Sequence, residues 1–392
     1  MGKAVQFGAG NIGRGFLGQL FFETGYSTTY VDVVQDLIDQ INARKSYPLR
    51  IVDEQTYTLT IGDVAALHAG QRDAVARCIA EADIGATAVG VPVLAKVAPL
   101  IAAGIELRYQ DPNAPPLNVI VCENMIEAGP YLREKVREHL SPACHRALDE
   151  RVGFVEASIG RMVPVMTDAV RSEDPLLVCV EAYCDLPVDA QGFKGPVPKL
   201  KNMQPRSNFG GYVERKLFIH NAGHATTAYL GYLRGHEYTW QAVEDKTVRK
   251  EVEAALAESK AGLVKKHGLD PAGLDEHIQD LLQRFANRGL GDQVARVAKD
   301  PIRKLGPRDR LIGAATMCIE QGIEPKNLAF AAAAAIRYDH AEDQAAQSVQ
   351  ALYRERGLEG VLTEICQVNR GAHLATLIQA GMQRLQREGW IR

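Results

Sequence analysis

The fold of this chain is decided by the stretch Ala4-Val5-Gln6-Phe7-Gly8-Ala9-Gly10-Asn11-Ile12-Gly13 near its N-terminus. Residues 4–7 have the composition of a short buried strand, and residues 14–24 have that of a helix. Between them lies the pattern G-x-G-x-x-G. A strand, this loop and a helix in that order are typical of the first turn of a dinucleotide-binding unit.

Each residue of the loop has an expected task in such a unit. Gly8 permits the tight turn, Gly10 lets a pyrophosphate approach the backbone, and Gly13 lets the helix lie close to the strand. Asn11 and Ile12 stand at the start of the helix, where unpaired N–H groups attract phosphates. We therefore expect these five residues to contact a dinucleotide cofactor.

Asp32 ends a second predicted strand, Thr28-Thr29-Tyr30-Val31, about 20 residues beyond the last glycine. A carboxylate there accepts hydrogen bonds from the adenosine ribose and repels a 2′-phosphate. The next residues, Val33-Val34-Gln35, supply no cation for such a phosphate, so the sequence favours NAD over NADP. The alternative is that the glycines form an ordinary loop and Asp32 caps a helix.

Further apolar runs at residues 87–89 and 119–122 alternate with helical patterns. This alternation predicts a parallel sheet with helices on both faces. Gly90 follows the first of these runs, at the strand end where ligands bind, although it is equally consistent with a plain turn.

Prolines and glycines cluster at residues 187–198, which we interpret as an interdomain connection. After residue 212 the pattern is helical, with helices expected at 243–266, 274–285, 329–336 and 372–387. The sequence therefore predicts an α/β fold. An N-terminal Rossmann-type doubly wound sheet over residues 1–190 precedes an all-helical domain over residues 191–392, with the active site in the cleft between them.

The composition excludes several classes of function. The 392 residues carry a net charge of −3, which gives no bulk attraction to nucleic acid or to an anionic membrane. No apolar run reaches the roughly 18 residues of a transmembrane helix. The seven cysteines include no CxxC pair, and free thiols favour a cytoplasmic location.

A second polar cluster lies in Lys216-Leu217-Phe218-Ile219-His220-Asn221-Ala222-Gly223-His224. Oxidation of an alcohol needs a base and donors for the developing alkoxide. On a regular helix Asn221 and His224 lie about 140° and 80° around the axis from Lys216, so all three can face one cleft. Lys216 is the candidate base if its pKa falls, Asn221 and Asn124 are candidate donors, and His224 is a candidate contact for a substrate hydroxyl.

Plainer alternatives exist for the same residues. Lys216 would suit a solvated helix surface, and His224 would suit a structural position. His220 and His224 have the i, i+4 spacing of zinc ligands, but Asn221 stands where the metalloprotease pattern has Glu. Without a cysteine pair either, we expect no metal site.

The chain resembles the polyol-specific long-chain dehydrogenases, and among them the mannitol-1-phosphate 5-dehydrogenases, over essentially its whole length. The resemblance implies metal-independent, NAD-dependent interconversion of mannitol 1-phosphate and fructose 6-phosphate. Lys216 would act as acid–base, within a Lys-x-x-x-x-Asn-x-x-His motif. The matching segments are residues 7–16, Thr87-Ala88-Val89-Gly90, Cys122-Glu123-Asn124-Met125, Glu214-Arg215-Lys216-Leu217-Phe218, Gly223-His224-Ala225 and Thr227-Ala228-Tyr229-Leu230-Gly231.

One segment departs from the family pattern Val-Asp-Arg-Ile-x-Pro, because Gly160 replaces the Asp in Ile159-Gly160-Arg161-Met162-Val163-Pro164. Arg161 and Arg215 are the candidate contacts for the substrate phosphate, although each would equally suit an ion pair. The family is often monomeric, and a dimer stays open. Two other functions stay open as well: a related dehydrogenase of an unphosphorylated polyol or sugar acid, and a non-catalytic NAD sensor.

Overall fold

The computed structural model of the chain describes residues 1–53, 55–164 and 168–391. It contains two compact units, Met1–Phe209 and Gly210–Arg392. The proline- and glycine-rich segment at 187–198 belongs to the first unit. There Asn118 exchanges two hydrogen bonds with the backbone of Lys194, at 3.0 and 2.8 Å.

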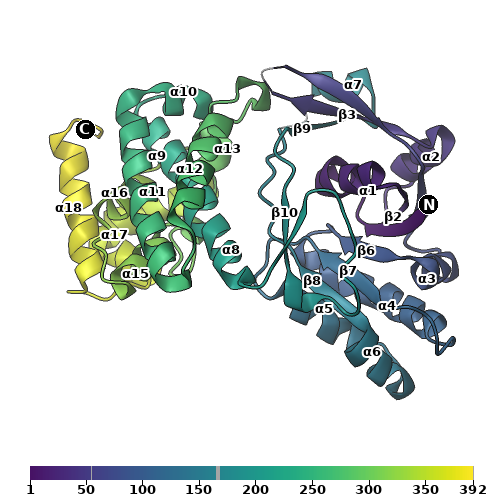
Figure 1. Cartoon of the computed structure of the whole chain (residues 1–392). Helices are drawn as coiled ribbons and strands as arrows, with labels where there is room; N and C mark the ends of the chain where they lie inside the picture. Colours follow the sequence, from purple (N-terminus) through teal and green to yellow (C-terminus); the bar gives the residue numbers. More distant parts are fainter. Residues whose placement is uncertain (54, 165–167, 392) are drawn as a thin grey trace. The chain divides into compact units, whose positions relative to one another are not determined.

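The first unit is built on a six-stranded sheet in the order β5-β2-β1-β6-β7-β8, in which all neighbouring strands are parallel (Figure 1). Its inner strands β6 and β7 are buried along their whole length, which requires helices on both faces. The strands are β1 (Gly2–Phe7), β2 (Tyr26–Asp32), β5 (Val64–His68), β6 (Ile84–Thr87), β7 (Leu117–Val121) and β8 (Val152–Glu156).

Two sets of helices cover this sheet. One apolar core joins the sheet to α3 (Arg72–Glu81), α4 (Val91–Arg108), α5 (Ala128–Arg137) and α6 (His145–Arg151). The opposite face packs against the π-helical segment η1 (Gly13–Leu17) with α1 (Gly18–Thr24), and against α2 (Gln35–Arg44). The predicted doubly wound sheet is therefore confirmed.

Smaller elements complete the first unit. A three-stranded sheet joins β4 (Tyr57–Ile61), β3 (Tyr47–Val52) and β9 (Val178–Glu181), and β10 (Leu186–Asp189) pairs with β11 (Met203–Arg206). A 3-10 turn lies at Pro142–Cys144, the short helix α7 spans Asp168–Glu173, and the 3-10 turn η3 spans Ala190–Gly192. A strand was expected over residues 87–89, but β6 ends at Thr87 and the chain then turns.

The second unit is helical over the residues that the structure describes, with an isolated bridge between Tyr238 and Gln293. Its elements are α8 (Phe209–Arg215), the π-helical segment η4 (Lys216–Asn221), α9 (Ala222–Leu233), α10 (Thr239–Glu244), α11 (Lys246–His267), α12 (Pro271–Phe285), the 3-10 turn η5 (Arg288–Leu290), α13 (Val294–Ala298), α14 (Pro301–Lys304), α15 (Ile312–Glu320), α16 (Lys326–Ile336), α17 (Gln344–Glu364) and α18 (His373–Arg387).

Helix α16 forms the centre of this unit. Its five consecutive alanines, residues 331–335, are completely buried, because α9, α11 and α18 all pack against it (Figure 1). Small side chains let helices approach closely on every side of α16. None of the helices in the described ranges is both long and apolar enough to cross a membrane.

Candidate active site

The glycine loop of the first unit has the geometry that a phosphate-binding turn needs. Gly8 has φ +89°, and a Cβ there would collide with the carbonyl oxygen of Ala88. A Cβ on Gly13 would collide with the carbonyl oxygen of Gly8. Gly10 is exposed, and a Cβ there would meet nothing within 4 Å. Gly8 and Gly13 are thus required by the fold, whereas Gly10 borders open space that a ligand can fill.

The helix after this loop begins with exposed Asn11 and half-buried Ile12, and then passes into the π-helical segment η1. Such π-helical turns are frequent at functional sites. Arg14, in the same segment, is buried, and its Nε donates to the carbonyl oxygen of Ala9 at 2.7 Å. This bond holds the loop from within the helix that follows it.

Asp32, at the end of β2, holds the loop from the other side. Its Oδ2 accepts the backbone N–H of Ala9 at 2.7 Å, and its Oδ1 accepts those of Val33 and Val34 at 2.7 and 3.1 Å. Helix α2 begins only at Gln35, and no side chain caps it. The carboxylate therefore orders the chain around the loop and keeps lone pairs for a further donor.

The turn after β6 is held by a carboxylate that sequence reasoning did not single out. Both oxygens of Glu123 accept backbone hydrogens, from Val89 and Gly90, each at 2.9 Å. Burial of this carboxyl raises its pKa. Gly90 itself has φ +86° and precedes α4, and Asn124 is exposed just beyond β7. Since β1, β2, β6 and β7 are parallel, all the candidate cofactor residues and Asn124 lie at the carboxyl edge of one sheet.

In the second unit Lys216 and Asn221 are the first and last residues of η4. The N–H of Ala222 donates to the carbonyl oxygen of Leu217, five residues back, which is the hydrogen bond of a π-helix. Five residues make little more than one turn of such a helix, so residues five apart lie closer together around its axis than in an α-helix. The expected 140° between Lys216 and Asn221 is wrong, because it assumed regular α-helical geometry, and the two side chains point in more similar directions than predicted.

The side chain of Lys216 lies in an environment that disfavours its charge. Burial lowers the pKa of its amine to about 8, and the positive charge of Arg310 adds to that effect. A desolvated lysine near a second cation loses its proton at a pH where an exposed lysine keeps it. This amine has the property that we required of a base.

His224 lies on α9, and its ring is held on three sides. Its Nε2 is 2.8 Å from Oδ2 of Asp292, and its ring stacks on Phe285 with centroids 4.7 Å apart. The ring of His220 stands edge-on to it at 6.2 Å. Burial lowers the pKa of His220 well below its ordinary value. His220 is thus part of the packing around His224.

The two arginines proposed as phosphate contacts differ in their surroundings. Arg161 is buried, and its guanidinium donates to the carbonyl oxygens of Glu181 and Gly15 and to Oε1 of Gln19. These bonds give Arg161 a role in holding the first unit together. Arg215, at the end of α8, lies over the ring of Tyr212 at 4.5 Å.

Gly160, which replaces the aspartate of the family pattern, lies beside a tyrosine ring. A Cβ on Gly160 would be 3.3 Å from Cε1 of Tyr183. An aspartate side chain at this position would therefore crowd the tyrosine.

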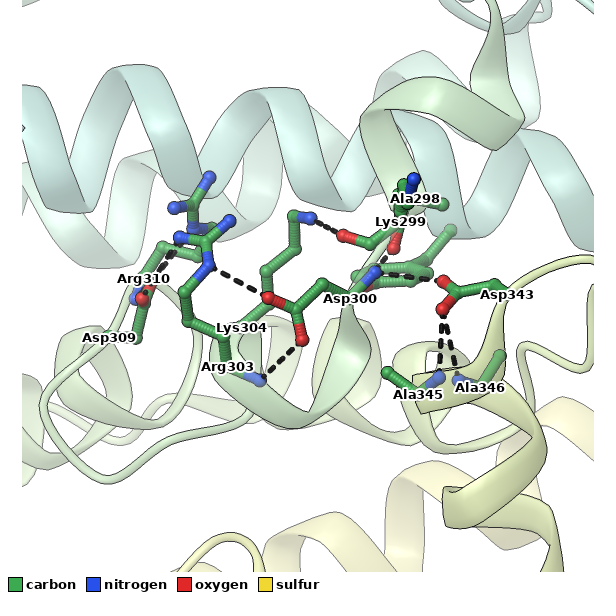
Figure 2. A network of polar contacts seen from close by, with 11 residues as sticks. Ala298, Lys299, Asp300, Arg303, Lys304, Asp309, Arg310, Asp343, Ala345 and Ala346 are labelled. Atoms are coloured by element: carbon green, nitrogen blue, oxygen red, sulfur yellow. Dashed lines mark hydrogen bonds and ion pairs between the residues drawn. The ribbon is translucent and has the colours of Figure 1, made fainter. Parts of the chain in front are cut away.

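A group of cations around Arg310 was not anticipated from the sequence. Lys304 is 4% exposed, and burial lowers the pKa of its amine to about 7, helped by the charges of Arg310 and Arg303. Figure 2 shows Lys304 reaching the carbonyl oxygen of Lys299, while Arg303 lies against Asp300 and Arg310 lies beside Asp309. The charge of Arg310 thus helps to lower the pKa of both Lys216 and Lys304.

Comparisons with known proteins agree with this fold. Two solved structures are similar over 99% of this chain. They are Pseudomonas fluorescens mannitol 2-dehydrogenase in a ternary complex with NAD and D-mannitol (18% identity, 92% of that chain, TM-score 0.75) and a substrate-free D-sorbitol dehydrogenase (16% identity, 93% of that chain, TM-score 0.83). At these identities the likeness shows the fold.

Two family models cover nearly the whole chain. The mannitol dehydrogenase Rossmann domain matches residues 2–202, and the mannitol dehydrogenase C-terminal domain matches residues 208–384. A Rossmann domain in a dehydrogenase family supports the expectation of NAD as cofactor. The chain therefore belongs to the mannitol dehydrogenase family.

Proposed function

We propose that this protein catalyses the NAD-dependent, reversible oxidation of mannitol 1-phosphate to fructose 6-phosphate. The observation that carries the proposal is the amine of Lys216, whose pKa burial lowers to about 8, in a π-helical segment that also carries Asn221. A buried lysine that is neutral near physiological pH is suited to proton transfer. It argues against a non-catalytic NAD sensor, which would have no use for such a group.

The glycine loop, Asp32 and Gly90 are the residues that we propose to hold NAD, and the open space beside Gly10 fits its pyrophosphate. Bound NAD supplies the hydride acceptor. Asp32 would accept hydrogen bonds from the adenosine ribose, which favours NAD over NADP. The NAD complex of the mannitol 2-dehydrogenase from Pseudomonas fluorescens supports this choice of cofactor.

The roles of the polar residues follow from their chemistry. The neutral Nζ of Lys216 takes the proton of the substrate hydroxyl and returns it in the reverse direction. The amide of Asn221 donates a hydrogen bond to the same oxygen, where negative charge develops, and Asn124 stays a further candidate donor. His224 contacts a neighbouring hydroxyl and so orients the polyol chain.

The substrate phosphate is proposed from charge. Arg310 places positive charge near Lys216 and acts on Lys304 as well, and a phosphate dianion bound beside this arginine would be stabilised by its charge. Arg215 stays a further candidate. We leave Arg161 out of the proposed substrate site, because its donors already bind protein oxygens.

The alternative substrate is an unphosphorylated polyol, which is favoured by the two similar solved structures, a mannitol 2-dehydrogenase and a sorbitol dehydrogenase. The deciding experiment measures NADH oxidation with fructose 6-phosphate and with fructose. A phosphate contact of about 1.5–3 kcal/mol implies at least a tenfold higher kcat/KM for the phosphorylated sugar. Arg310→Gln should reduce that ratio. Equal efficiency of the two sugars in the wild type would favour the unphosphorylated substrate.

A further inference from the structure

Asp292 is a buried carboxylate bound to two side chains of the second unit. It is 3% exposed, its Oδ2 lies 2.8 Å from Nε2 of His224, and its Oδ1 accepts Nε–H of Arg296 at 2.9 Å. Burial opposes its ionisation, but the hydrogen bond from His224 and the charge of Arg296 hold its pKa below the ordinary value. Asp292 is thus a carboxylate throughout the neutral range.

The position of this carboxylate is fixed by the backbone on either side of it. Its own carbonyl oxygen accepts the N–H of Thr239 at 2.9 Å, and the neighbouring Gln293 forms the isolated bridge with Tyr238. Gly291, just before it, has φ +56°. Asp292 is therefore held in a turn that is tied to the start of α10.

The carboxylate decides which nitrogen of His224 carries the proton. A carboxylate only accepts hydrogen bonds, so Nε2 must be the donor. In the neutral ring Nδ1 is then an acceptor. Nδ1 makes no hydrogen bond with any residue in the described ranges. Stacking on Phe285, which is 1% exposed, prevents the ring from turning away from this arrangement.

We propose that Asp292 is a positioning residue, which fixes the tautomer and the ring plane of His224 so that Nδ1 accepts a hydrogen bond from a substrate hydroxyl beside the reacting carbon. The contact with the substrate rests on the proposed function, whereas the effect of Asp292 on the tautomer does not. A neutral acceptor at Nδ1 selects a hydroxyl donor at that point. Because Nδ1 has no proton to donate, the hydrogen bonds to the reacting oxygen come from the amide groups proposed above.

The effect on the tautomer can be measured without a substrate. In protein labelled with ¹⁵N-histidine, the ring nitrogens of His224 should have the chemical shifts of the Nε2–H tautomer, with the signals assigned by their loss in His224→Gln. Asp292→Asn keeps the size of the side chain but places an amide donor beside Nε2, and should produce the Nδ1–H tautomer. Arg296→Gln is the matched control, because it removes the other partner of Asp292 and should leave the tautomer unchanged. An Nδ1–H tautomer in the wild type, or no change in Asp292→Asn, would overturn the proposal.

Kinetics test the consequence for the reaction. Asp292→Asn should lower kcat/KM for the polyol by about 10–100-fold, by analogy with the loss that follows removal of the partner that orients a metal-binding histidine. The Kd for NADH should not change. In a His224→Gln background Asp292→Asn should cause no further loss, because both changes remove the same contact. If the double variant instead lost activity by the product of the two single losses, Asp292 would not act through His224. If the wild type turns over no polyol, the proposed function fails while the NMR measurement still decides the role of Asp292.

Discussion

The carboxylate of Asp32 accepts the backbone N–H of Ala9 at 2.7 Å, which joins the end of β2 to the glycine loop after β1. The two strands are neighbours in the sheet, so this bond fixes the loop to the residue that we expect to bind ribose. Asp32 thus has two roles that a substitution can separate. The position of the loop depends on an acceptor, whereas selection against a 2′-phosphate depends on the negative charge.

Asp32→Asn should therefore weaken NAD binding and reduce the ratio by which the protein prefers NAD to NADP. The amide oxygen can still accept from Ala9, but the charge and one acceptor are lost. A hydrogen bond to a charged group contributes about 1.5–3 kcal/mol, which corresponds to at least a tenfold weaker Kd for NADH. Fluorescence titration with NADH and with NADPH measures the Kd of each cofactor. Asp36→Asn, on the exposed start of α2, is the control. A wild type that already binds NADPH more tightly would contradict this account of Asp32.

The glycines of the loop should separate cofactor binding from folding. Gly10→Ala adds a methyl group where no protein atom lies within 4 Å, so the thermal midpoint should stay within a few degrees while NADH binding weakens. Gly13→Ala places a methyl group against the carbonyl oxygen of Gly8 and should lower both the thermal midpoint and the affinity for NADH. Calorimetry and NADH titration give the two quantities. If Gly10→Ala binds NADH as the wild type does, the pyrophosphate lies elsewhere.

Activity should survive exhaustive treatment with EDTA. In the parts of the chain that the structure describes, no group of three or more His, Cys, Asp or Glu side chains is arranged to hold a metal. The two histidines with zinc-like spacing, His220 and His224, stand edge-on, and Nε2 of His224 already lies against Asp292. Loss of activity that added zinc restores would show that this view of the histidines is wrong.

The second unit should depend on the pair between Glu251 of α11 and Arg384 of α18. Their atoms meet at 2.6 and 2.8 Å, and the arginine lies over Phe330 at 4.2 Å. Arg384→Met leaves the buried carboxylate of Glu251 without its partner, which should lower the free energy of unfolding by about 3 kcal/mol.

Arg387→Met is the matched control, because Arg387 lies on the same helix but its side chain is 74% exposed. Its ion pair with Glu388 is long, at 4.0 Å. It should change the free energy of unfolding by less than about 0.5 kcal/mol. Denaturant titration followed by circular dichroism compares the two variants. Equal stability of Arg384→Met and the wild type would mean that water replaces the arginine at no cost.

The nucleotide unit was predictable because its signals are local. The glycine loop, the apolar runs and Asp32 lie within a few dozen residues, and each has its own chemical requirement. The sheet β4-β3-β9 was not foreseen, because Leu49 pairs with Val178, which lies far away in the sequence. Apolar runs show that a strand forms, but not which distant strand it joins.

The site was predictable by residue type and less so by geometry. The motif around Lys216 was found, but its spacing was interpreted with the period of a regular helix, and the π-helical turn changes the directions of Lys216 and Asn221. Asp292 is 68 residues from His224, and a single aspartate after a glycine carries no signal of that contact. Arg161 shows the limit of a motif, because its position in the pattern gave no sign that its guanidinium donates to protein oxygens within the first unit.

The sharpest prediction concerns the proton that Lys216 transfers. Its pKa is lowered from 10.5 to about 8, so the neutral base becomes available as the pH rises through that value. At saturating NAD, kcat/KM for mannitol 1-phosphate should therefore increase with pH by the loss of one proton, with a midpoint near 8 or lower. The positive nicotinamide ring can only depress the pKa further.

Two variants test whether this rising limb of the pH profile, in which kcat/KM increases with pH, reports the titration of Lys216. Arg310→Gln removes a charge that lowers its pKa, and should move the limb to higher pH in the reactions of both phosphorylated and unphosphorylated polyols. Lys216→Ala should reduce turnover by about 10²–10⁴-fold, the usual contribution of a positioned proton-transfer group. NADH binding should remain, because the glycine loop and Asp32 belong to the other unit. Added primary amines should restore part of the rate. Near-normal turnover in folded Lys216→Ala would remove Lys216 from the mechanism, and a limb that does not move in Arg310→Gln would assign the titration to another group.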